Sequence, residues 1–338
     1  MRTKPDRRTV LISGAGLAVS AMLPPDAHSA ERTEVRMATG LRATAQSIVW
    51  IGTEAGVFRK HDLKVSFAKL EAGGPEATAG LMRGDWEFAQ TGTVPIAEAV
   101  LKGDDPVILL RNHAPNDSII IKTRRELTGL DQLTAKTVGV LTDAYSGQTG
   151  VITRLAIEKA GATATYRGLG TYQNIYAALI ARQIDAAALP VDYRFVGQGQ
   201  YGWNVFDTGV YGVPSIFATT RKIIAERRDV ALRMVRGFVE SIHLFKTEPD
   251  VVVPLLQRFL SFDDRKAVAD LHAYYVPLFP KVPRPDLSDG MEEIRTLFAK
   301  RYPAAQNLQE RDIADSTVID EVERSGFIDQ LFAADSKR

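Results

Sequence analysis

The distribution of apolar residues separates two kinds of segment through about residue 220. Short apolar runs such as Val35–Thr39 predict strands, whereas apolar residues that recur at helical spacing, as over 48–58, predict helices. Further strands are predicted at Val65–Leu70, Glu87–Gln90, Val107–Arg111, Ile119–Lys122, Thr137–Leu141, Ala164–Arg167 and Ala186–Leu189, and further helices at Pro75–Arg83, Pro95–Lys102, Gln148–Ala160 and Tyr172–Ala181. Because strands and helices alternate, the pattern predicts an α/β fold with parallel sheets covered by helices.

After Arg221 the pattern becomes almost entirely helical. Helices are predicted at Asp229–Thr247, Val251–Leu260, Arg265–Tyr275 and Met291–Arg301. Between the last two lies Val276–Pro285, which contains four prolines. Proline removes a backbone donor, so this segment predicts an extended surface loop.

A weak internal repeat indicates that the α/β part has two similar halves. Ala79–Ala89 resembles Ala177–Ala187, and Leu81 of the first copy corresponds to Leu179 of the second, an offset of 98 residues. Each copy is typical of the end of a helix, a turn and the start of a strand. Two copies at one offset predict two lobes of the same topology.

Composition narrows the possible functions. A chain of 338 residues suggests about two domains at ~150 residues each. The absence of cysteine excludes thiol nucleophiles, disulfides, cysteine-ligated zinc and iron–sulfur clusters. The 42 Lys and Arg residues nearly balance the 41 Asp and Glu residues, which argues against a nucleic-acid partner.

The first thirty residues, Met1–Ala30, are typical of a signal peptide. A basic start precedes the apolar stretch Val10–Leu23, and small residues then predict cleavage after Ser29 or Ala30. The stretch would span ~21 Å as a helix, less than the ~30 Å hydrocarbon core of a membrane. Arg7–Arg8 partly matches a twin-arginine export signal, although it is equally an ordinary basic start. We therefore expect an exported, soluble protein of the periplasm.

Several segments, in order, resemble a known family over about residues 33–220. They are Glu54–Phe58 with Asp62–Val65, Leu81–Ala89, Thr91–Pro95, Leu127–Leu133 leading into Thr137–Val140, and Ile184–Pro190. The family is the periplasmic solute-binding proteins of ABC importers, in the sulfonate/taurine/nitrate and NMT1/THI5-like group. His61 and Asp62 stand where Lys or Glu and Gly are common in that family, so the turn there is expected to differ.

The resemblance implies a two-lobed periplasmic-binding-protein fold of the α/β class. Each lobe would be a mostly parallel sheet flanked by helices, with the ligand cleft between the lobes. Lobe 1 would comprise 31–114 plus 212–338, including the helical C-terminal tail, and lobe 2 would comprise 115–211. The crossovers would fall near Arg111–Asn116 and Asp207–Tyr211. Such lobes close on a ligand by hinge motion.

Two helix starts without acidic residues suggest where an anion would bind. Ser146 is a good N-cap for a helix that has no acid until Glu158, so its free N–H groups are open to an external anion. Thr44–Ser47 opens a second helix with no acid until Glu54, and Arg42 lies just upstream. Without the resemblance, both are equally ordinary helix starts capped by Ser, Thr or water.

Further candidates follow predicted strands, where open α/β sheets bind ligands. Gly73–Gly74 would let backbone approach a ligand or simply form a tight turn. Asp192 would accept from an amino group of the ligand or cap the following helix. The complete predicted ligand-binding set is Arg42, Gln46, Ser47, Gly73, Gly74, Thr91, Gly92, Thr93, Tyr145, Ser146, Gly147, Gln148, Thr149, Asp192 and Tyr211.

Signals of catalysis are weak. Gly197–Gly202 fits G-x-G-x-x-G, but a helix and not a strand appears before it, which argues against a dinucleotide site. The five histidines lack metal-ligand spacing, and no Ser/His/Asp set is suggested. We expect no enzyme activity, no cofactor and no metal.

The resemblance therefore predicts a monomeric binding protein that captures a small solute, expected to be a sulfonate, taurine or nitrate-like anion. It would deliver this solute to an ABC permease of the inner membrane with its cytoplasmic ATPase. The alternatives are a pyrimidine-type ligand, an enzyme of the pyrimidine-synthase (THI5-like) type, or a sensory module that presents its ligand to a membrane receptor. The enzyme lacks support because that family's cysteine-rich segment has no counterpart here.

Overall fold

The structure, a computed structural model, describes residues 32–113, 119–145, 147–196, 201–209 and 214–333. The predicted signal peptide, the candidate residues Ser146 and Tyr211, and most of the Gly197–Gly202 motif lie outside these residues. The described part contains two five-stranded sheets.

Sheet A is built mainly from the N-terminal part of the chain. Its strands are β1 (Thr33–Thr39), β2 (Leu63–Lys69), β3 (Phe88–Gly92), β4 (Pro106–Arg111) and β10 (Ser215–Thr220), in the order β2-β1-β3-β10-β4. β1 pairs in parallel with β2 and β3, whereas β10 is antiparallel to both β3 and β4. Four strands therefore run in one direction, and β10 returns between two of them.

Sheet B has the same arrangement. It consists of β5 (Ile119–Thr123), β6 (Thr137–Val140), β7 (Thr165–Gly168), β8 (Ala186–Pro190) and β9 (Asn204–Asp207), in the order β7-β6-β8-β5-β9. β6 is parallel to β7 and β8, and β5 is antiparallel to β8 and β9. The predicted two-lobed α/β architecture of mostly parallel sheets is confirmed, with one reversed strand in each sheet that alternation alone did not predict.

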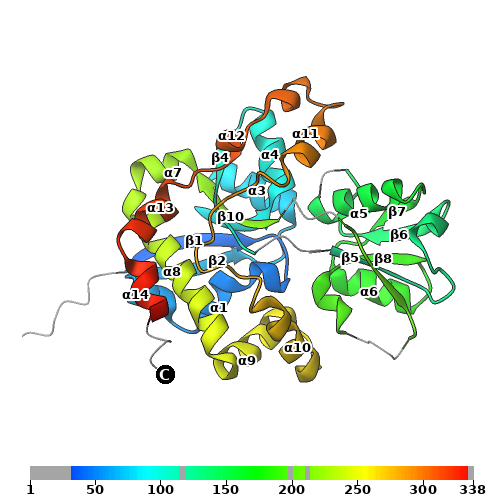
Figure 1. Cartoon of the computed structure of the whole chain (residues 1–338), viewed down its shortest axis with the longest axis horizontal. Helices are drawn as coiled ribbons and strands as arrows, with labels where there is room; N and C mark the ends of the chain where they lie inside the picture. Colours follow the sequence, from blue (N-terminus) through cyan, green and yellow to red (C-terminus); the bar gives the residue numbers. More distant parts are fainter. Residues whose placement is uncertain (1–31, 114–118, 146, 197–200, 210–213, 334–338) are drawn as a thin grey trace, which may run out of the picture. The chain divides into compact units, whose positions relative to one another are not determined.

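The helices flank both sheets (Figure 1). Those of the α/β part are α1 (Ile48–Glu54), α2 (Val57–Lys60), α3 (Gly74–Arg83), α4 (Thr93–Leu101), α5 (Gln148–Lys159) and α6 (Tyr172–Ile180), with 3-10 turns η1 (Thr44–Gln46), η2 (Leu130–Leu133) and η3 (Val191–Arg194). The later ones are α7 (Arg221–Glu226), α8 (Arg228–Thr247), α9 (Pro249–Leu260), α10 (Arg265–Tyr275), α11 (Met291–Phe298), η4 (Pro303–Asn307), α12 (Glu310–Ile313), α13 (Thr317–Arg324) and α14 (Phe327–Ala333).

Successive side chains along the strands of sheet A point to opposite faces, and each face packs against a different apolar cluster. Phe88 and Phe217, whose rings stack 5.4 Å apart, face a cluster that includes α1 and α8. Ala89 and Ala218 point to the other face, against α4 and α11. Since the side chains of Phe88 and Gln90 share a face, the last residues of β3 carry polar groups into the first of these clusters.

The predicted elements are largely present, with shifted ends and some omissions. The two repeat copies are the α3–β3 and α6–β8 joints, and Phe88 and Ala186, also 98 residues apart, begin the equivalent strands β3 and β8. The strands β9 and β10 and the helices α7, α12, α13 and α14 were not predicted. The N-cap of α5 is Gly147, and the expected N-cap Ser146 lies outside the described residues.

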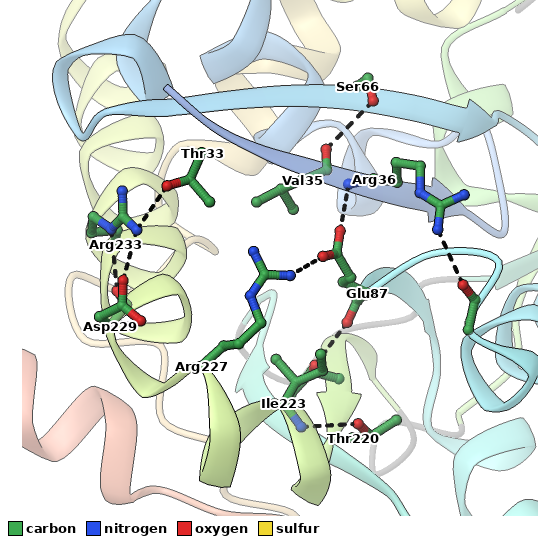
Figure 2. A network of polar contacts seen from close by, with 12 residues as sticks. Thr33, Val35, Arg36, Ser66, Glu87, Thr220, Ile223, Arg227, Asp229 and Arg233 are labelled. Carbon is green, nitrogen blue, oxygen red and sulfur yellow. Dashed lines mark hydrogen bonds and ion pairs between the residues drawn. The ribbon is translucent and has the colours of Figure 1, made fainter. Parts of the chain in front are cut away.

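Glu87, just before β3, connects several elements of sheet A (Figure 2). Its carboxylate accepts the Arg36 N–H of β1 at 2.8 Å and pairs with Arg227, while its carbonyl accepts the Thr219 hydroxyl of β10 at 2.7 Å. The Glu87 side chain is only one-fifth exposed. Hydrogen bonds of a partly buried carboxylate are stronger than those of an exposed one.

We expect Glu87→Ala to lower the free energy of unfolding by about 1–3 kcal/mol, because a backbone N–H and Arg227 lose a charged partner. Urea unfolding measures the change. The matched control is Glu34→Ala, which removes the exposed pair with Lys64 and should cost less than about 1 kcal/mol. Equal losses in the two variants would contradict a structural role for Glu87.

Candidate functional site

A small cavity lies where loops from the two sheets meet. It has a volume of about 20 Å³, which is room for about one water molecule. Its lining residues come from the ends of β1, β3 and β6 and from the starts of α3 and α5: Leu41, Gln46, Gly74, Pro75, Gly92, Leu141, Thr142, Gly147, Gln148, Thr149 and Gly150. The carboxyl ends of parallel strands are the usual binding edge of such sheets.

The N-terminus of α5 forms one wall of the cavity. The helix has 12 residues and no acid in its first turn, and its N-cap, Gly147, has no side chain with which to cap it. The first turn closes through the Val151 N–H, which donates to the Gly147 carbonyl at 2.9 Å. The N–H groups before Val151 have no partner within the helix, and the helix dipole makes this end partially positive. The wall can therefore bind an acceptor group.

The start of α4 offers fewer available backbone N–H groups to the cavity. Its N-cap is Gly92, but the Thr93 N–H already donates to the Pro214 carbonyl at 3.3 Å and Pro95 has no N–H. Gly92 instead provides space: a Cβ built there would lie 2.1 Å from Oε1 of Gln148 and 3.0 Å from its Cβ. The absence of a side chain at Gly92 lets the loop after β3 approach α5 closely.

The prediction that one helix opens at Thr44–Ser47 is wrong, and the anion site expected there stays a prediction. Thr44–Gln46 is a 3-10 turn, and α1 begins only at Ile48 and has seven residues. The turn is already occupied, because Oδ1 of Asp192 accepts the Thr44 N–H at 2.7 Å and the Thr44 hydroxyl at 2.5 Å. Asp192 of η3, 148 residues later in the chain, supplies the carboxylate that the sequence near Thr44 lacks. Asp192 therefore joins the two lobes and does not cap the following helix.

Arg42 does not line the cavity. Its Nε lies 3.3 Å from Oε2 of Glu71, and its Nη1 donates to Oγ of Ser261 at 3.0 Å. Arg42 is the only basic residue of the predicted set, and both of these partners belong to its own lobe. Among the described residues that line the cavity, none carries a charge.

Tyr172 of α6 contacts the first turn of α5 through its hydroxyl. Its hydroxyl lies 2.6 Å from the Thr149 hydroxyl, and both side chains are buried. Burial raises the pKa of Tyr172, and the nearby Asp192 and Glu71 carboxylates raise it further. The phenol therefore stays protonated at neutral pH, and it links α5 to the region of Asp192.

The structure brings six of the predicted residues to the cavity: Gln46, Gly74, Gly92, Gly147, Gln148 and Thr149. Others support its walls. Ser47 donates to the Thr44 carbonyl at 2.9 Å, Thr91 to the Gly74 carbonyl at 3.3 Å, and Thr93 to the Pro214 carbonyl at 2.8 Å. Gly73, with φ 78°, is the N-cap of α3 in a conformation that favours glycine.

Tyr145 is not among the residues that line the cavity: its side chain is 64% exposed and lies against the Arg154 guanidinium. Sequence reasoning also missed Leu41, Leu141 and Thr142. Leu41 follows the first predicted strand of lobe 1, and Leu141 and Thr142 lie at the end of the predicted strand Thr137–Leu141 of lobe 2, so the strand-end rule already contained the signal that would have found them.

Two other features bear on chemistry. Across the described residues, no group of three or more His, Asp or Glu side chains is placed to bind a metal ion. None of the helices in those same residues combines the length and apolarity that crossing a bilayer requires.

Comparison with solved structures of other proteins identifies the fold of this chain. No family model matches the chain, and no curated protein matches it in sequence. Among solved structures, the alkanesulfonate-binding protein SsuA from Xanthomonas axonopodis pv. citri, bound to MOPS, has a TM-score of 0.66 at 15% identity, over 84% of this chain and 96% of that one.

Two further structures agree. The periplasmic aliphatic sulphonate-binding protein SsuA from Escherichia coli has a TM-score of 0.63 at 17% identity, over 82% of this chain and 91% of that one. The periplasmic nitrate-binding protein NrtA from Synechocystis PCC 6803 has a TM-score of 0.70 at 12% identity, over 87% and 89%. The chain therefore has the two-lobed α/β fold of periplasmic solute-binding proteins.

Proposed function

We propose that this protein is the periplasmic solute-binding component of an ABC importer, which captures a small solute between its lobes and delivers it to a permease. The observation that carries this proposal is the N-terminus of α5, which has no acid in its first turn and lines a cavity to which both lobes contribute. The shared fold with sulfonate- and nitrate-binding proteins supports the same reading.

An acceptor group of the solute binds at the start of α5. Carboxylate, sulfonate and nitrate oxygens all suit backbone N–H groups at a positive helix end. Thr149 and Gln148 add polar side chains beside those N–H groups. Since no lining Arg or Lys is present among the described residues, the site relies on backbone donors rather than on a full opposite charge.

Binding requires the lobes to separate and close. A cavity of about 20 Å³ is too small for an organic anion, so the solute enters only when contacts between the lobes open. Two such contacts are Gly92 against Gln148 and Thr44 with Asp192. The chain passes between the sheets twice, from β4 to β5 and from β9 to β10, and lobes joined in this way close by hinge motion.

A ligand panel tests the proposal directly. Nitrate, alkanesulfonates, carboxylates, amino acids and pyrimidines are titrated into the mature protein and followed by calorimetry and thermal unfolding. A true ligand at a hundredfold excess over its Kd should stabilise the protein by ~2.7 kcal/mol. If every compound leaves both the heat signal and the melting temperature unchanged, solute capture is refuted.

Gln148→Glu should weaken binding of an anionic ligand by roughly tenfold or more. Like charges about 4 Å apart near a protein surface repel by ~4 kcal/mol, and 1.4 kcal/mol equals tenfold in affinity. Folding should not suffer, because acids suit the first turn of a helix. Titration calorimetry measures the effect, with Gln173→Glu in the first turn of α6 as the matched control that should bind normally. Equal affinity in both variants would remove α5 from the site.

Gly92→Ala should oppose closure, because the new methyl group would overlap the Gln148 side chain. Overpacking of this kind costs about 1–3 kcal/mol, so affinity should fall roughly 5- to 150-fold. The open form, in which the lobes separate, should keep its stability. Adding Gln148→Ala should restore much of the affinity by removing the amide. A double variant that binds as poorly as Gly92→Ala would show that the contact is unrelated to closure.

A further inference from the structure

Four buried side chains carry polar atoms for which the described residues offer no hydrogen-bond partner. They are Thr39 Oγ1, both amide atoms of Gln90, Asn112 Oδ1 and Asp192 Oδ2. Each of these residues is at most 1% exposed. A buried polar atom without a partner costs about 1–3 kcal/mol, and native proteins contain few of them. Several in one region indicate that something else satisfies them.

Two of these side chains, Asp192 and Asn112, contact the turn η1 directly. Asp192 accepts from Thr44, and Asn112 Nδ2 donates to the Ala45 carbonyl at 2.7 Å. The backbone N–H of Asn112 donates to the carbonyl of Ser215, and the hydroxyl of Ser215 lies 3.4 Å from Gln46 Nε2.

Gln90 belongs to the same region. It is the register partner of Thr39, and its carbonyl accepts the Gly40 N–H at 2.7 Å. Gly40 in turn approaches the Gln46 amide: a Cβ built on Gly40 would lie 3.5 Å from Gln46 Oε1. Because Gln46 also lines the cavity, this polar region adjoins the proposed solute site.

The unpartnered atoms are mostly acceptors. Asn112 Oδ1, Gln90 Oε1 and a carboxylate Oδ2 of Asp192 accept only, whereas Gln90 Nε2 donates only and the Thr39 hydroxyl does either. We call Gln90, Asn112 and Asp192 the acceptor cluster. Burial raises the pKa of Asp192, yet its protonated form would still leave two acceptors. Nitrate, sulfate and simple sulfonates have no hydrogen to donate, so they do not match this cluster.

We propose that the transported solute carries N–H donors, as an ammonium, amide or ring N–H, which occupy the acceptor cluster while an acceptor group of the same molecule meets α5. This inference rests on the proposed function and narrows it, because it excludes a bare inorganic anion as the physiological ligand. Asp192 is then the residue that determines specificity: one oxygen joins the lobes through Thr44, and the other accepts from the solute.

Matched pairs of probes test the inference. Ethanesulfonate is compared with 2-aminoethanesulfonate, and propionate with 3-aminopropionate, by calorimetry on the mature wild-type protein. Within each pair the amino member should bind roughly tenfold or more tightly, since only it supplies donors. Equal affinities, or a preference for the member without nitrogen, would overturn the inference and leave the proposed function intact. If no probe of either pair binds, the inference falls, while the full ligand panel still decides the proposed function.

Asp192→Asn isolates the carboxylate. Asn keeps one oxygen for Thr44 and replaces the unpartnered oxygen with a donor, so the preference for the amino member should shrink to about threefold or less. Asp207→Asn, which removes an exposed partner of Arg194 in the same lobe, is the matched control and should keep the preference. A preference unchanged in Asp192→Asn would assign the selectivity to another group.

Gln90→Met separates binding from folding. Met has a similar volume and no unpartnered polar atoms, so the melting temperature should stay the same or rise. Affinity for the amino probe should nevertheless fall several-fold, which a merely structural role for Gln90 does not predict. Unchanged affinity in this variant would contradict the placement of the donor group in the acceptor cluster.

Discussion

The buried carboxylate of Asp192 bonded to Thr44 is the interaction on which the arrangement of this protein depends. It connects η3 of one lobe to η1 of the other, and it occupies the donors of a turn that would otherwise attract an external anion. With that turn occupied and Arg42 bound to Glu71, the N-terminus of α5 is the main donor surface left at the cavity. The charge character of the site therefore follows from contacts within the chain.

Local sequence predicted most of the fold because its signals are local. The period of apolar residues placed β1, α3 and α10, and the repeat at an offset of 98 residues anticipated two sheets with equivalent strand orders. The direction of β5 and β10 lies beyond such signals, because an apolar run looks the same in a parallel or an antiparallel pair. β10 pairs with strands far away in sequence, so only the tertiary structure reveals it.

The site was predictable to a similar extent. The start of α5 was found from the absence of acids up to Glu158, and Gly92 and Gly74 from their positions after strands. The same argument did not foresee the 3-10 turn at Thr44, where the compensating acid comes from a distant segment. Gln90 and Asn112 gave no signal at all: a polar residue at a strand end is ordinary in sequence, and its lack of a partner emerges only from packing.

The position of β10 also determines the order in which the lobes are completed as the ribosome makes the chain. β4 pairs in sheet A only through β10, and the whole of sheet B is synthesised between these two strands. Sheet B, from β5 to β9, is continuous in sequence and can assemble as soon as it emerges, whereas sheet A waits with an unpaired strand. Sheet B is therefore an insertion within the sequence of sheet A, and β4 can pair with β10 only after the whole of sheet B has been synthesised.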